Sequence, residues 1–211
     1  MELKGLKINF LGDSITEGAG ASSPDATYLK LIERAEKAAV CRNYGVGGTR
    51  ISRQTQPSET ERWDHDFIDR AAAMDRDADV VVVFGGTNDF GHGDAKFGTM
   101  TDRSVYTFYG AMHILIRQLL TDFPDAAIVF MTPLHRADES AHDGKPELKA
   151  YVEAIREVCA YYAVPVLDLY SVSGMQPQFQ LIRERYMPDG LHPNDEGQKL
   201  IARRLTAFLK A

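Results

Sequence analysis

The chain has few cysteines, no surplus of basic residues and no long apolar run, and each shortage excludes a class of protein. Its two cysteines, Cys41 and Cys159, stand in apolar surroundings without a CxxC motif. We therefore expect buried, reduced thiols rather than a disulfide framework. Lysine and arginine number 24 against 30 acidic residues, a formal net charge of −6 that argues against nucleic acid as a partner. No stretch approaches the roughly 20 apolar residues of a membrane span, so a membrane span is not expected either.

Signals for export, metal binding and repetition are also absent. The opening residues, MELKGLKINFLGD, lead straight into a strand pattern and lack a signal peptide's apolar stretch, which predicts a cytoplasmic protein. No HExxH motif or Cys/His cluster with ligand spacing occurs, so we expect neither a metal nor another cofactor. Without repeats or linkers, the length predicts one domain over residues 1–211. Nothing in the sequence indicates an oligomeric state.

What the chain does have is a regular alternation of strand and helix patterns. Short apolar runs, bounded by glycine or polar residues, predict strands at 6–12, 40–45, 79–86, 126–134 and 164–170. Apolar residues at helical spacing predict helices at 26–40, 65–74, 104–122, 146–162 and 192–210. This order predicts an α/β fold in three layers, with a five-stranded parallel sheet between two layers of helices. Two long irregular stretches remain, at about 46–64 and 90–104, and loops of this length are often functional.

Polar residues and glycines gather where the predicted strands end. They are Ser14 after the first strand, Gly48 after the second, Asn88 after the third, and Asp189 with His192 before the last helix. Ligands of parallel α/β sheets bind beyond the carboxyl ends of the strands, so these residues are expected to meet at one edge. A hydroxyl nucleophile needs a base, the base needs an acid, and a developing oxyanion needs N–H donors. These residue types can supply all of those parts.

Each residue alone has a simpler structural interpretation. Ser14 is in the place of a helix N-cap, and Asn88 is common in turns. The glycines of GVGGTR suit a tight turn, and Arg50 stands where a GxGxxG dinucleotide motif needs its third glycine. A GxSxG nucleophile elbow is excluded, because Thr16 occupies its last glycine position.

The joint occurrence of the motifs is more specific than any of them. GDSIT, the glycine of NYGVGGT, GTND and DGLHP resemble, in order, the four motif blocks of the SGNH hydrolases, the GDSL-like esterases and lipases. The resemblance extends from Gly12 to His192. It implies a flavodoxin-like strand order and an acyl transfer to serine. The first block has isoleucine where the family motif has leucine.

The resemblance also implies a role for each residue. Ser14 would be the nucleophile, His192 its base, and Asp189 the acid that orients His192. The backbone N–H groups of Ser14 and Gly48 and the side-chain amide of Asn88 would form the oxyanion hole. Gly48 fits the second block better than its neighbour Gly47. The expected reaction is hydrolysis of an ester of a small molecule.

The residues of the two long loops, 46–64 and 90–104, indicate what kind of substrate the site binds. Trp63 and Phe90 could stack on a sugar face, and Arg50 and Asp94 could bond hydroxyl groups. His92 follows a predicted strand and could line the same cleft. We therefore expect a small acyl ester, with an acetylated carbohydrate as first choice. Lysophospholipids and thioesters, which the family also hydrolyses, remain an alternative. The alternative from another functional class is a carbohydrate-binding protein that has the same fold but no catalytic activity.

Overall fold

The apolar run Val80–Phe84 forms β3, the middle strand of the sheet, and all five of its residues are buried. Its side chains alternate between two cores: Val81 and Val83 belong to one, while Val80, Val82 and Phe84 belong to the other. A strand alternates its side chains between the two faces of a sheet, so a continuous apolar run implies cover on both faces.

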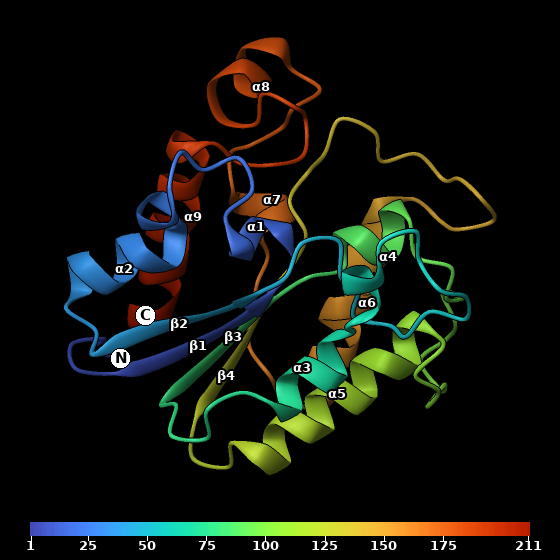
Figure 1. Ribbon diagram of the computed structural model, residues 1–211, viewed down its shortest axis with the longest axis horizontal. Helices are drawn as coiled ribbons and strands as arrows, with labels where there is room; N and C mark the ends of the chain where they lie inside the picture. The colour runs from blue at the N-terminus through green and yellow to red at the C-terminus, as the bar shows by residue number, and fades with distance from the viewer.

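The structure is a computed structural model that describes residues 1–211, and it contains five parallel strands in the order β2-β1-β3-β4-β5 (Figure 1). The strands are β1 (Lys7–Gly12), β2 (Val40–Gly45), β3 (Val80–Phe84), β4 (Ala127–Met131) and β5 (Val166–Leu167). The α/β fold and its flavodoxin-like strand order are thus confirmed. Gly12 pairs in register with Gly45 on one side and Phe84 on the other, so β2, β1 and β3 end at one level.

Five helices cover the two faces of the sheet, as Figure 1 shows. The first face carries α2 (Tyr28–Glu36) and α9 (Asp195–Lys210), which pack on each other and on one core. The second face carries α3 (Phe67–Ala72), α5 (Phe108–Asp122) and α6 (Leu148–Tyr161) over the other core. Each lies within a predicted helical segment, and each is shorter than predicted. No helix has the length and apolar character needed to cross a membrane.

Four short helices were not predicted. They are α1 (Ser14–Glu17), α4 (Thr87–Gly91), α7 (Leu169–Val172) and α8 (Gln180–Tyr186). The 3-10 turns η1 (Pro24–Ala26) and η2 (Glu61–Asp64) add to them. Three of the helices follow strand ends directly. The predicted strand 164–170 stops at Leu167 because the Asp168 side chain accepts the Ser171 N–H and begins α7.

Phe90 lies in α4, whereas we predicted it in the 90–104 loop, in contact with the substrate. That prediction is wrong: the Phe90 side chain is 1% exposed and belongs to the core under α4. Its ring meets the rings of Tyr151 and His142, and the Arg136 guanidinium lies 5.2 Å from its centroid. Both cysteines are free and buried, as predicted.

Phe90→Ala should lower the free energy of unfolding by about 3–5 kcal/mol, because a buried ring is replaced by a cavity. Urea unfolding followed by circular dichroism measures this loss. Phe179→Ala is the matched control, since that ring is 68% exposed and its loss should cost less than about 0.5 kcal/mol. Similar losses for the two variants would contradict the placement of Phe90 in the core.

Candidate active site

Ser14 stands at the abrupt junction between β1 and α1. The Asp13 side chain accepts the Ile15 N–H at 3.0 Å and thereby begins the helix directly after the strand. A Cβ on Gly12 would overlap the Thr16 side chain, so the turn needs glycine at that position. Ser14 is the first residue of α1, where a helical N–H has no partner within the helix.

The structure brings Ser14, His192 and Asp189 into one hydrogen-bonded row. The Ser14 Oγ lies 3.0 Å from His192 Nε2, and His192 Nδ1 lies 2.6 Å from Asp189 Oδ2. Asp189 Oδ1 also accepts the backbone N–H groups of Leu191 and His192. Burial alone would raise the pKa of Asp189, but these hydrogen bonds from His192 and Leu191 bring it below its ordinary value. Asp189 is therefore ionised at neutral pH, and its charge favours the His192 tautomer with the proton on Nδ1.

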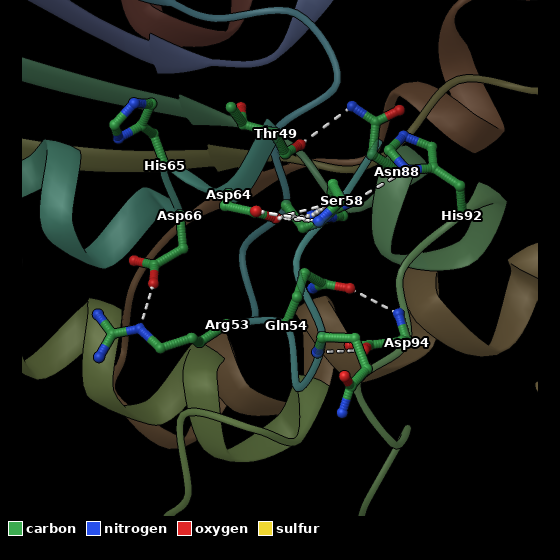
Figure 2. Close-up of polar contacts among 12 residues, drawn as sticks. Thr49, Arg53, Gln54, Ser58, Asp64, His65, Asp66, Asn88, His92 and Asp94 are labelled. Carbon is green, nitrogen blue, oxygen red and sulfur yellow. Dashed lines mark hydrogen bonds and ion pairs between the residues drawn. The ribbon is translucent and has the colours of Figure 1, made fainter. Parts of the chain in front are cut away.

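Gly48 and Asn88 approach the same edge from β2 and from α4. Asn88 is nearly buried, and its side-chain nitrogen donates to the Thr49 carbonyl at 3.0 Å, which fixes the amide (Figure 2). Gly48 has a positive φ of 79°, a conformation that favours glycine. The chain supplies no acceptor for the Gly48 N–H, whereas the Gly47 N–H donates to Glu17 Oε2 at 2.8 Å. Of the two glycines, Gly48 therefore has the available donor.

A half-buried arginine that the sequence interpretation missed connects these segments. Arg70 of α3 donates to the Gly12 and Tyr44 carbonyls at the ends of β1 and β2, and to the Thr49 hydroxyl. Its Nε donates to the His65 carbonyl. Burial lowers the pKa of Arg70 to about 10, so it stays protonated at neutral pH. Its position in a helical pattern gave no sign of this role, since its partners are backbone carbonyls.

Two predicted substrate residues are engaged within the protein. Arg50 was predicted to bond substrate hydroxyls, and this is wrong because its side chain is 2% exposed. Its Nη2 donates to Ser58 and Asp64, and its Nη1 lies 2.9 Å from His92 Nδ1. Asp94 is exposed, but both its oxygens accept hydrogen bonds from residues 55–56, which join the two long loops.

Trp63 and His92 remain at the site. A Cβ on Gly48 would overlap the Trp63 indole, so this ring lies directly against the glycine. The centroids of the Trp63 and His92 rings are 4.8 Å apart. The two aromatic rings thus form a wall beside the Gly48 N–H.

Comparisons with known proteins agree with this geometry. The profile of the GDSL-like lipase/acylhydrolase family matches residues 10–200. One solved structure is 35% identical, with a TM-score of 0.87 over 100% of this chain and 98% of the other. A protein from Lactobacillus plantarum is 30% identical, with a TM-score of 0.85 over 98% and 97%. An acetyl xylan esterase is 22% identical, with a TM-score of 0.68 over 97% and 100%, and shares the fold. No curated protein matches the chain.

Asp13→Asn should stabilise the protein above pH 6. Burial raises the pKa of Asp13 from 3.8 to about 6, although the Ile15 N–H and the Arg70 charge oppose the rise. Between these values the folded chain holds a proton that the unfolded chain has lost, so wild-type stability falls as pH rises. The asparagine cannot ionise, and its side-chain oxygen can still accept the Ile15 N–H.

We expect the variant to exceed wild type by about 1–3 kcal/mol in unfolding free energy at pH 8, with the advantage shrinking towards pH 4. Urea unfolding at pH 4, 6 and 8 measures the difference. An advantage of equal size at all three pH values would show that the Asp13 charge is not its source.

Proposed function

Because the chain belongs to the GDSL-like lipase/acylhydrolase family, we propose that it is a serine esterase that hydrolyses small acyl esters through an acyl-serine intermediate. The observation that carries the proposal is the row Ser14–His192–Asp189 beside the Gly48 N–H and the Asn88 amide. A carbohydrate-binding protein without catalysis would have no use for a serine hydroxyl hydrogen-bonded to an oriented imidazole.

In the first half of the reaction, Ser14 Oγ attacks the ester carbonyl while His192 Nε2 takes its proton. The carbonyl electrons move to the oxygen, and His192 becomes an imidazolium whose charge Asp189 stabilises. The bond to the alcohol oxygen then breaks, and the alcohol leaves with the proton from His192. The acyl group is left on Ser14.

In the second half, water attacks the acyl-serine while His192 takes a proton from it. The acid leaves, and the proton returns to Ser14 Oγ. In both halves the carbonyl oxygen becomes negative, and the N–H groups of Ser14 and Gly48 and the Asn88 amide are its donors. Such donors are effective because they are fixed before the charge develops. The bond from Asn88 to Thr49 and the absence of an internal acceptor for Gly48 support this role.

The surroundings of the site favour a short acyl group on a polar alcohol. A cavity of about 390 Å³ lies between the two long loops, with Pro57 as its only apolar aliphatic residue. A second cavity of about 460 Å³, also mainly polar, adjoins it at His92. None of these cavities is lined by Ser14, Asp189 or His192. The two polar cavities adjoin the site through His92, and the first also through Trp63, which packs on Gly48, whereas the most apolar cavity lies between α2 and α9 and contains neither ring. The acetyl xylan esterase is named for a substrate of this class, and the polar lining of the two cavities supports the same class for this chain.

Ser14→Ala should fold normally and lose at least about a thousandfold in kcat, because the variant has no nucleophile for His192 to activate. Hydrolysis of p-nitrophenyl acetate measures the loss, and thermal unfolding checks the fold. The control is Ser22→Ala, an exposed serine that bonds Asp195 and should keep wild-type activity. A Ser14→Ala variant that retained a tenth of the rate would disprove the assignment.

Acyl length provides a separate test of the substrate. With p-nitrophenyl esters from acetyl to octanoyl, kcat/KM should fall, because the cavities beside the site have no apolar wall for a long chain. A matched apolar pocket would instead gain about 1–3 kcal/mol for each methylene that it accommodates. Rates that rise through octanoyl would support the lysophospholipase or thioesterase alternative and leave the proposed catalytic residues unchanged.

A further inference from the structure

A second histidine, His92, lies beside the proposed oxyanion donors. It follows Asn88 by four residues, and its backbone N–H donates to the Asn88 carbonyl at 3.0 Å. His92 is the C-cap residue directly after α4, and Figure 2 shows its ring beside the Asn88 side chain. Trp63, which packs on Gly48, lies against the His92 ring, with the two ring centroids 4.8 Å apart. His92 therefore lies next to where the ester group would bind.

Arg50 determines which nitrogen of His92 carries the proton. A guanidinium can only donate, so the 2.9 Å contact between Arg50 Nη1 and His92 Nδ1 makes Nδ1 an acceptor. The proton of the neutral ring is then on Nε2. Ser58 and Asp64 hold Arg50 in place, and its burial prevents it from turning away.

The ring is neutral at neutral pH. Partial desolvation, followed by the positive charges of Arg50, Lys145 and Arg136, lowers the pKa of His92 to about 4. With Nδ1 engaged by Arg50 and Nε2 protonated, this ring has no free lone pair and cannot act as a base. It can only donate a hydrogen bond.

The Nε2–H group has no acceptor within the protein, and His92 is exposed, so a ligand can reach this donor. His92 lines both polar cavities, of about 390 and 460 Å³. Gln54, Ser58 and Asp94 line the first cavity, and Lys96 and Asp143 line the second. A ligand with several oxygen atoms suits such walls, whereas a hydrocarbon would leave their polar groups unpaired.

We propose that His92 determines specificity by donating its Nε2–H to an oxygen of the substrate's alcohol part, and that this alcohol is polyhydroxylated, as in a sugar. This proposal rests on the ester hydrolysis proposed for Ser14. It adds a subsite and a named donor for the alcohol part of that substrate. His92 takes part in binding, whereas His192 transfers protons.

Two esters with the same acyl group separate these roles. Methyl glucoside monoacetate offers ring hydroxyls, and cyclohexyl acetate has a ring of the same size without them. Acetate release gives kcat and KM for each. Wild type should prefer the glucoside ester. His92→Phe keeps an aromatic ring beside Trp63 and loses the donor, so kcat/KM for the glucoside ester should fall about tenfold, mainly through KM. For cyclohexyl acetate it should change less than about twofold, because no hydroxyl contact is lost.

Two further variants complete the comparison. His92→Gln places an N–H donor at a similar reach and should recover most of the lost glucoside activity. His65→Phe is the matched control, because the His65 side chain is exposed and lies away from His92 in Figure 2. It should hydrolyse both esters as wild type does. Thermal unfolding verifies each fold, and His92→Leu gives the same comparison if phenylalanine does not fit.

The outcomes distinguish the subsite from the esterase activity itself. Equal losses on both esters for His92→Phe, or no recovery with His92→Gln, would mean a structural role and overturn the proposal. Equal kcat/KM for the two esters in wild type would overturn the polyhydroxylated substrate and leave the esterase intact. No acetate release from either ester or from p-nitrophenyl acetate would overturn the proposed function itself.

Discussion

The Arg70 guanidinium is the interaction on which the site depends. It draws the carbonyl groups of Gly12 and Tyr44 to one cation, so the ends of β1 and β2 are held together. The same group holds Thr49, the neighbour of Gly48. Two segments distant in sequence, the end of β1 and residues 44–49, thus take their relative position from one side chain of α3. Arginine suits this place because its planar group offers five donors in fixed directions, which the single ammonium of lysine cannot reproduce.

A buried carboxylate completes the connection on the other side of Gly48. Asp89 is 2% exposed and accepts the N–H groups of Ile51 and Ser52 and the Ser52 hydroxyl. Asn88, the preceding residue, donates to Thr49. Residues 49–52 are therefore bound to α4 by adjacent side chains, and Gly48 and Asn88 keep their positions as one unit. Burial raises the pKa of Asp89, and its hydrogen bonds from Ser52 and Ile51 oppose that rise, so losing one of these donors would leave a buried acid incompletely hydrogen-bonded.

The sequence predicted the sheet well because burial on both faces leaves an unmistakable apolar run such as Val80–Phe84. The motif residues were correctly predicted to lie close together, because the carboxyl ends of parallel strands meet at one edge of the sheet. Helices α1, α4 and α7 were missed because four or five residues are too few to show a repeated helical period, and single caps such as Asp13 and Asp168 decide where such helices begin. Loop residues were misjudged for a related reason. The sequence does not show that Arg50 meets Asp64 or that α4 turns Phe90 inwards, because both depend on tertiary contacts.

The two histidines of the site show how one residue type acquires two chemistries. His192 Nδ1 faces the carboxylate of Asp189, which can only accept, so the proton sits on Nδ1 and Nε2 is a free acceptor opposite Ser14. His92 Nδ1 faces the guanidinium of Arg50, which can only donate, so Nδ1 is the acceptor and Nε2 carries the proton. A carboxylate at Nδ1 thus leaves Nε2 free to act as a base, whereas a guanidinium at Nδ1 leaves Nε2–H as a hydrogen-bond donor. The residue behind each ring, more than the ring itself, decides what the ring can offer to a substrate.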